Sequence, residues 1–248
     1  MSGIRPNVIC ISGFDPSGGA GILADIKTIE MHRAQGLGVC TALTFQNEKT
    51  FSGMEWVDES VVMKQLDALL KASHPKAAKI GIIENLELSA KIIDKLKTVF
   101  PQVKIVWDPV FKASAGFDFH TSFDNSLFYA ILEKINLLTP NILESEMLFG
   151  TANPDEIAQK SGCSVLLKGG HSDSRMATDF FIGNGEIIKF QHERKIGFSK
   201  HGTGCILSSA IAANLALGTE LPEACKRGKD YIQDILTSNP TQLAYHYE

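Results

Sequence analysis

The string HGTGC, residues 201–205, has the clearest chemical potential in the chain, because its glycines lead directly into a long apolar segment of helical period. The backbone amides of Gly202, Thr203 and Gly204 would stand unpaired at the start of that helix, where amides and the helix dipole bind an anion. The dipole would also lower the pKa of Cys205 from its ordinary ~8.5 towards neutrality. Cys205 could equally be a small apolar packing residue. This turn predicts an anion site and leaves the role of the cysteine open.

Two carboxylates follow neighbouring expected strands. Asp108 comes directly after the apolar run that ends at Trp107, and Glu144 lies just beyond Asn141 at the start of the next helical segment. Hard carboxylates in such places suit Mg²⁺, which binds through one or two carboxylates together with phosphates. Each acid also has a plainer explanation, since Asp108 precedes a proline turn and Glu144 would complement a helix dipole. Their joint occurrence favours a metal site.

A lysine ends a third expected strand, in the string VLLKGGH. Lys168 is followed by two glycines that leave the backbone amides bare, so its ammonium group can meet a phosphate. Lysines also commonly end strands at a protein surface. No G-x-x-x-x-G-K-[ST] string occurs anywhere, so this turn is not a Walker-type loop.

The first glycine-rich turn, SGFDPSGGAGILAD, opens a helix directly after a strand. Within it GAGILA fits the G-x-G-x-x-A form of the dinucleotide fingerprint. The acidic residue expected about 20 positions further on is missing, and Gln46 stands at the end of the second expected strand instead. The turn is equally explained as a tight connection that packs a helix on a strand.

Short apolar runs alternate with segments of helical period along the chain, which is typical of a mostly parallel sheet covered on both faces. We therefore expect an α/β protein whose ligands sit beyond the carboxyl ends of the strands. Strands are predicted at 8–12, 38–45, 79–83, 104–107, 137–139 and 164–168, with a hairpin at 179–182 and 187–191. Helices are predicted at 20–33, 58–72, 86–100, 125–135, 142–149, 155–160, 205–217 and 223–236, and the stretch from Pro109 to about Thr121 as a functional loop.

The composition predicts one soluble globular domain over residues 1–248. The chain is 44% apolar and 21% charged with a net charge of −4, and a basic excess that would favour nucleic acid or an anionic membrane is absent. Its five cysteines are widely spaced, without a C-x-x-C pair. No apolar run is long enough for a signal peptide core or a membrane span. A reducing cytoplasm with free thiols fits best.

The strings SGFDPSGGAGILADIKT, ALTFQN, WDPV, TPNILESEMLFG, VLLKGGH and HGTGC, in that order, resemble the hydroxymethylpyrimidine/phosphomethylpyrimidine kinases of thiamine biosynthesis, in the ribokinase-like superfamily. The resemblance covers about residues 7–236. It implies a three-layer α/β/α sandwich with a central, mostly parallel sheet, in a homodimeric cytoplasmic enzyme. It also implies MgATP-dependent phosphorylation of 4-amino-5-hydroxymethyl-2-methylpyrimidine and then of its monophosphate.

The resemblance also implies roles for individual residues. An aminopyrimidine edge offers donors and acceptors that Asp25 and Gln46 can read. Most of the superfamily places an aspartate base at the position of Cys205, and the vitamin-kinase branch carries the cysteine. Four groups follow: Gly13, Asp25, Gln46 and Val110 at the pyrimidine; Lys168 and Asn141, with Thr203 and Gly204, at ATP; Asp108 and Glu144 at Mg²⁺, directly or through water; and Gly202, Thr203, Gly204 and Cys205 around the transferring phosphoryl group.

Two segments depart from the family pattern. After KIG, where the family usually has a methionine, a leucine and a glycine, this chain reads Ile82, Ile83 and Glu84, so Ile82 would have to pack the pyrimidine ring. After DPV the family usually runs through small apolar residues, and here Lys112 adds a cation. Lys112 is either an exposed charge or a contact to the phosphate of the monophosphate substrate.

Three other functions remain open. A pyridoxal or pyridoxine kinase of the same fold is the nearest, since relatives with the cysteine accept the vitamin B6 ring. GAGILA alone would permit a Rossmann-type dehydrogenase, against which the missing ribose-binding acid counts. A non-catalytic pyrimidine-binding module would have no need for Lys168, Asp108, Glu144 and Cys205 together.

Overall fold

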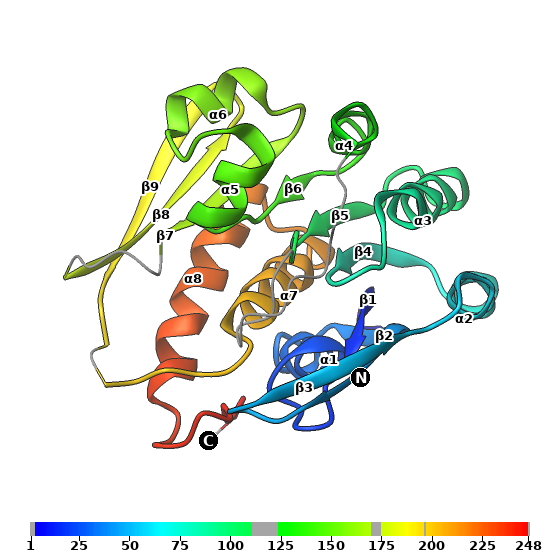
Figure 1. Ribbon diagram of the computed structural model, residues 1–248, viewed down its shortest axis with the longest axis horizontal. Coiled ribbons are helices and arrows are strands. Elements are labelled where there is room, and N and C mark those ends of the chain that lie inside the picture. The colour runs from blue at the N-terminus through cyan, green and yellow to red at the C-terminus, as the bar shows by residue number, and fades with distance from the viewer. Residues whose placement is uncertain (1–2, 111–123, 170–174, 196, 248) are drawn as a thin grey trace.

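A computed structural model describes residues 3–110, 124–169, 175–195 and 197–247 (Figure 1). Strands from both halves of the chain share one sheet, whose described members lie in the order β3-β2-β1-β4-β5-β6-β7-β8-β9. Their bounds are β1 (Asn7–Phe14), β2 (Gln35–Gln46), β3 (Phe51–Trp56), β4 (Pro75–Ile80), β5 (Lys104–Trp107), β6 (Leu137–Leu138), β7 (Ser164–Gly169), β8 (Met176–Gly183) and β9 (Glu186–Glu193).

The six strands from β2 to β7 in that order are parallel. Antiparallel pairings occur only towards the edges among the strands described, where β3 joins β2 and the β8–β9 hairpin joins β7. The predicted α/β class with a mostly parallel central sheet is confirmed. The carboxyl ends of the parallel strands consequently meet at one edge of the sheet, where the candidate site residues lie.

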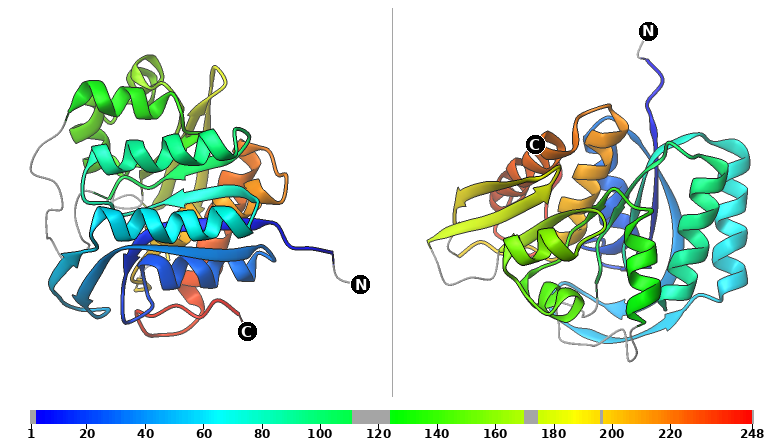
Figure 2. Two further views of the ribbon diagram at one scale, coloured as in Figure 1. Left: turned by 90° about the vertical axis from the view of Figure 1, so that its right-hand side faces the viewer. Right: turned by 90° about the horizontal axis from the view of Figure 1, so that it is seen from above.

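Helices cover both faces of the sheet, and the right-hand view of Figure 2 shows the two layers on opposite sides of it. In β1 the side chains of Ile9 and Ile11 enter one apolar cluster, whereas Val8 and Cys10 enter the other. Such a strand, buried on both faces, is why the sequence shows an unbroken apolar run. One layer holds α2 (Glu59–Ala72), α3 (Leu86–Val99), α4 (Asn125–Leu132), α5 (Ile142–Phe149) and α6 (Pro154–Lys160), and the other holds α1 (Gly21–Met31), α7 (Thr203–Ala216) and α8 (Leu221–Thr237).

Helix α7 is the element that positions the anion-binding turn. Every residue from Ile206 to Asn214 is buried, and the helix contacts α1, α8 and the strands β1, β4 and β5. Ala210, Ala212 and Ala213 are fully buried, and side chains this small let the helix axis come close to its neighbours. A helix enclosed in this way holds its N-terminus at a defined place beyond the strand ends.

The structure corrects several expected elements. Strand β3 had no counterpart in the prediction, because residues 51–56 include a glycine and a serine and only half bury their apolar side chains against β2. Strand β2 begins three residues earlier than expected, at Gln35. Helix α1 ends before Arg33, whose φ of 62° is left-handed and cannot continue a helix.

Two further expectations are limited by the residues described. The predicted loop up to about Thr121, including Lys112, lies mostly outside them. In the part of the chain that is described, no helix has both the length and the apolar character needed to cross a bilayer.

Candidate active site

Asp108, Lys168 and Gly204 meet at the carboxyl edge of the sheet. The Nζ atom of Lys168 donates a hydrogen bond to Oδ1 of Asp108 over 2.7 Å. A Cβ atom added to Gly204 would lie 3.5 Å from both Oδ2 of Asp108 and Nζ of Lys168. Segments almost 100 residues apart thus place an anion, a cation and the first turn of α7 in direct contact.

Asp108 is held in its ionised form. Its backbone N–H donates to the carbonyl of Ile80, which fixes the residue just after β5. Burial opposes ionisation of the carboxyl, but the Lys168 ammonium and the Thr139 hydroxyl stabilise the anion and hold its pKa below the usual range. A buried carboxylate with a cationic partner is a suitable group for binding a second cation or for orienting the lysine.

Glu144 and Asn141 form a capping box at the start of α5. The backbone N–H of Asn141 donates to Oε2 of Glu144 over 2.7 Å, and the N–H of Glu144 donates to Oδ1 of Asn141 over 2.9 Å. Glu144 is therefore a first-turn acid that caps a helix, as the plainer explanation predicted. Asn141 also pairs with Lys168 in a β-bridge, which brings this cap beside the lysine.

The same residues fit a divalent cation. Burial raises the pKa of Glu144 to about 7, with the Lys168 charge opposing the rise and the Asp108 charge adding to it. Two carboxylates that repel one another are stabilised by a cation placed near both. Among the described residues no group of three or more histidine, cysteine or acidic side chains could hold a metal. Asp108 and Glu144 would together supply the one or two carboxylates that Mg²⁺ prefers beside a nucleotide.

The anion-binding turn depends on a glycine at position 202. Gly202 is the N-cap of α7 with a φ of 77°, a left-handed value that favours glycine. A Cβ atom there would lie 2.0 Å from the carbonyl oxygen of Gly19, so any side chain is excluded. Because a glycine cap supplies no side-chain acceptor, the first amides of α7 are left for an external anion.

The expected reactivity of Cys205 is corrected by the structure. Burial raises the pKa of its thiol to about 11; Lys79 opposes the rise, while Asp25 and Asp108 add to it. The helix dipole, which would lower this pKa, acts on a partly buried thiol whose anion would face two carboxylates. Without a bound cation or nucleotide, Cys205 is a thiol at neutral pH.

Three of the residues expected at the pyrimidine lie near one another. A Cβ atom on Gly13 would lie 3.0 Å from Cγ2 of Ile82, so the ends of β1 and β4 are in contact. Val110 lines a small cavity together with Gly81 and Ile83, the two chain neighbours of Ile82. Gln46 ends β2, the strand next to β1, and is half-buried. These residues share the site's edge of the sheet with Asp108.

Asp25 does not line this region. Its side chain has no exposed surface, and both of its oxygens accept hydrogen bonds from Nζ of Lys79 over 2.9 Å. Ser209 donates a further hydrogen bond to Oδ1 of Asp25. The expectation that Asp25 reads the pyrimidine edge is wrong in this structure, because a buried lysine and a serine occupy its oxygens.

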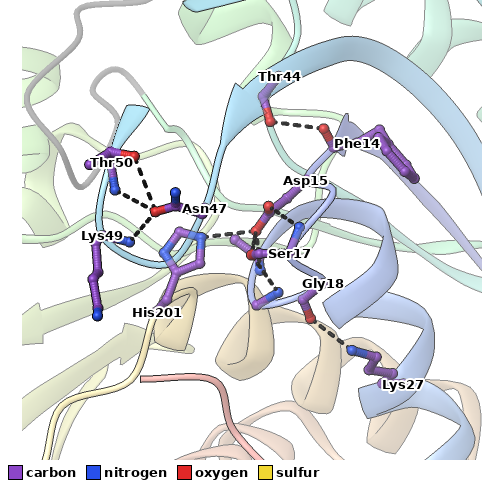
Figure 3. Close-up of polar contacts among 12 residues, drawn as sticks. Phe14, Asp15, Ser17, Gly18, Lys27, Thr44, Asn47, Lys49, Thr50 and His201 are labelled. Carbon is purple, nitrogen blue, oxygen red and sulfur yellow. Dashed lines mark hydrogen bonds and ion pairs between the residues drawn. The ribbon is translucent and has the colours of Figure 1, made fainter. Parts of the chain in front are cut away.

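Three residues to which the sequence assigned no role also belong to the site: Lys79, Asp15 and His201. Lys79 is fully buried in β4, and a lysine at the start of the apolar run 79–83 was the available signal. Asp15 and His201 join the first glycine-rich turn to the anion-binding turn, with 2.9 Å between Oδ2 and Nε2 (Figure 3). Nothing in the residue pattern paired two positions so far apart in the chain.

An anion-binding helix start, a lysine and two carboxylates at one edge of an α/β sandwich define a phosphotransferase of the ribokinase-like fold. The chain belongs to the phosphomethylpyrimidine kinase family, whose model matches residues 15–247. A hydroxymethylpyrimidine/phosphomethylpyrimidine kinase from Aquifex aeolicus is 34% identical, with 97% of each chain covered. Membership of a kinase family leaves the dehydrogenase and the non-catalytic binding module without support.

Solved structures of vitamin kinases share the fold. The phosphomethylpyrimidine kinase of Clostridium difficile superposes with a TM-score of 0.77 at 32% identity, covering 93% of this chain and 99% of its own. The pyridoxal kinase of Staphylococcus aureus, in complex with AMP-PCP and pyridoxal, gives a TM-score of 0.80 at 25% identity, covering 95% and 89%. The fold alone therefore does not separate the two substrates.

Proposed function

We propose that this protein transfers the γ-phosphoryl group of ATP to the hydroxymethyl group of 4-amino-5-hydroxymethyl-2-methylpyrimidine, and then phosphorylates the monophosphate to the diphosphate, in thiamine biosynthesis. The observation that carries the proposal is the contact of Lys168 and Asp108 with Gly204 at the start of α7. The named relatives and the family model support the pyrimidine as the substrate.

Lys168 and Asn141 would bind the ATP phosphates. The ammonium group of Lys168 has three N–H donors, and Asp108 uses one of them, so donors remain for phosphate oxygens. Mg²⁺, held by Asp108 and Glu144 directly or through water, would neutralise phosphate charge. The two carboxylates would hold this cation, and Asp108 also orients the lysine through its hydrogen bond.

The amides of Gly202, Thr203, Gly204 and Cys205 would stabilise the transferring group. The hydroxymethyl oxygen attacks the γ-phosphorus, the bond to the β–γ bridging oxygen breaks, and ADP leaves. Phosphoryl transfer has a loose transition state, so fixed donors around the phosphoryl oxygens supply most of the rate. Cys205 would act as a secondary base only in its thiolate form: its own proton would first pass to water, helped by the Lys79 charge that lowers the thiol pKa, and the thiolate would then accept the hydroxyl proton.

Gly13, Gln46, Ile82 and Val110 would hold the pyrimidine ring. Ile82 is almost fully buried beside Gly13 and offers an apolar surface in place of the methionine that is usual in the family. Gln46 would hydrogen-bond the ring edge, because an amide presents both a donor and an acceptor.

Pyridoxal is the second candidate substrate, on the strength of the fold shared with the pyridoxal-bound kinase. ATP consumption should be measured with the hydroxymethylpyrimidine and with pyridoxal, and the pyrimidine products resolved into mono- and diphosphate. We expect both pyrimidine products and slower turnover of pyridoxal. A clear preference for pyridoxal contradicts the proposal, and a monophosphate alone confines the enzyme to one step.

We also propose a homodimer in the cytoplasm. Phe14, Leu43 and Phe45 expose 37%, 44% and 49% of their surface on adjacent strands, and apolar side chains grouped in this way favour coverage by a second subunit. All five cysteines are free thiols, as a reducing compartment requires. Light scattering should give twice the mass of the chain, and a monomeric mass would contradict the dimer.

A further inference from the structure

The first glycine turn (residues 13–21) and the anion turn (residues 201–204) are joined by a buried hydrogen bond between Asp15 and His201. Asp15 is 1% exposed, and its Oδ2 atom lies 2.9 Å from Nε2 of His201. Figure 3 shows the imidazole of His201 reaching from the anion turn to the carboxylate of Asp15, which lies inside the first glycine turn. The two residues are far apart in the chain and join the segments that surround the phosphoryl-transfer region.

The hydrogen bonds of Asp15 identify the proton on His201. Oδ1 accepts from the backbone N–H of Ser17, and Oδ2 accepts from the Ser17 hydroxyl and from the backbone N–H of Ala20, each over 2.9 Å. Burial works against the charge, but these donors and His201 hold the pKa of Asp15 below its ordinary value. Because the carboxylate only accepts, Nε2 of His201 carries the hydrogen and donates it.

The backbones of the two turns are packed without space between them. A Cβ atom on Gly202 would lie 2.0 Å from the carbonyl oxygen of Gly19, and one on Gly19 would lie 2.6 Å from Cδ2 of His201. On its other side, the backbone N–H of His201 donates to the carbonyl of Gln242 over 2.9 Å. The left-handed Gly202, from which α7 begins, is therefore held between the first glycine turn and the C-terminal segment.

We propose that Asp15 and His201 form a latch that fixes the anion turn on the first glycine turn, and that both are positioning residues for phosphoryl transfer. The proposal rests on the proposed function for its catalytic consequence. Donors that stabilise a phosphoryl group act only when they are already in place, and a displacement of about 1 Å costs on the order of 10²-fold in rate. The latch supplies this placement without touching the substrate.

The test compares His201→Phe, which removes the donor, with His201→Gln, whose amide N–H can replace Nε2. Lys27→Met is the matched control, because Lys27 donates to the carbonyl of Gly18 and so holds the same first glycine turn without reaching the anion turn. We expect kcat of His201→Phe to fall about 10- to 100-fold, with KM for ATP and for the pyrimidine within threefold. His201→Gln should recover most of kcat, and Lys27→Met should keep it within twofold.

Hydrogen–deuterium exchange without substrate provides a readout that needs no turnover. The amides of the peptide spanning 198–206 should exchange faster in His201→Phe and at the wild-type rate in His201→Gln and Lys27→Met. Unchanged exchange in His201→Phe, or equal kcat values for His201→Phe and His201→Gln, would overturn the latch. Faster exchange combined with a wild-type protein that phosphorylates no pyrimidine would leave the latch standing and overturn the proposed function.

Asp15→Asn gives the same test if His201→Phe does not fold. The variant keeps the size of the side chain, but its NH2 group cannot accept, so whichever way the amide turns at least one N–H group that the carboxylate now binds meets another donor. We expect the same loss of kcat and the same faster exchange at 198–206. A folded Asp15→Asn protein with wild-type kcat and exchange would overturn the proposal independently of His201.

Discussion

At the scale of single residues, burial decides the protonation states of the candidate site. A helix N-terminus and a nearby lysine favour a thiolate at position 205, yet desolvation and the carboxylates of Asp25 and Asp108 raise the pKa of this thiol to about 11. Asp108 differs because Lys168 touches it directly and outweighs a comparable loss of water. Asp108 is ionised because its counter-charge is in direct contact, whereas Cys205 stays neutral because, among the residues described, no cation touches its sulfur as closely.

The first prediction concerns Cys205. Cys205→Ala should lose much of the activity, by no more than the 10²–10⁴-fold typical of general acid–base catalysis, because the backbone amides remain in place. Binding of ATP, measured by calorimetry, should stay within threefold of wild type. Full turnover by the variant would show that the amides alone suffice and that the thiol is not a base.

The second prediction concerns the pH dependence of stability through Glu144. Its pKa is raised from 4.5 to about 7 in the folded protein, so folding is favoured by the protonated carboxyl. The stabilisation is complete below pH 4.5 and is lost as pH rises through about 7.

Without metal, Glu144→Gln should therefore gain stability relative to wild type between pH 5 and pH 8, by about 1–3 kcal/mol. Urea unfolding at both pH values, in the presence of a chelator, measures this difference. A difference between the two proteins that does not change with pH would contradict the raised pKa.

At the scale of elements, one buried ion pair ties α7 to the sheet. Lys79 on β4 donates to Asp25 on α1, and Ser209 on α7 donates to the same carboxylate. Burial disfavours the Lys79 ammonium, but the carboxylates of Asp25 and Asp108 raise the pKa of Lys79 well above its ordinary value. The charged Lys79 therefore holds the Asp25 carboxylate in place, and that carboxylate in turn accepts the hydrogen bond from Ser209 on α7.

The third prediction follows from this pair. Lys79→Met should destabilise the protein by about 3–5 kcal/mol, because Asp25 is left buried without its cation. Replacing both partners, as in Lys79→Met with Asp25→Leu, should restore most of the loss. Thermal unfolding of the two variants distinguishes them, and equal stabilities would mean that the pair does not act as a unit.

Most helices and central strands were predictable because their patterns are set locally. The apolar stripe of α2, its Asp58 cap and the run Ser164–Gly169 follow from helical period, capping chemistry and buried-strand composition. Strand β3 was missed because its pairing with β2 is a contact between segments and its residues have no strong preference of their own.

At the scale of the whole molecule, the site is formed by the carboxyl edge of the sheet together with α5 from one helical layer and α7 from the other.

The fourth prediction concerns ligand binding at this site. AMP-PCP with Mg²⁺ at about 100 times its Kd should stabilise the folded protein by about 2.7 kcal/mol, which corresponds to about 5–11 °C in Tm for a chain of this size.

A chelator should abolish most of that shift, and Asp108→Asn should reduce it because one of the two carboxylates for Mg²⁺ is lost. Differential scanning calorimetry with and without the chelator measures both effects. An undiminished shift with the chelator present would contradict a role for a divalent cation in nucleotide binding.

The amino-acid sequence predicted the α/β class, the family and the segments that carry Asp108, Asn141, Glu144, Lys168 and the anion turn. These follow from periodicity and from short motifs, whose residues are adjacent in the chain. Three features appeared only in the folded structure: the ion pair between Asp25 and Lys79, the raised pKa of the Cys205 thiol, and the hydrogen bond between Asp15 and His201. The reason is physical: burial and the distance between charges are properties of packed segments, and neither can be read from residue types alone.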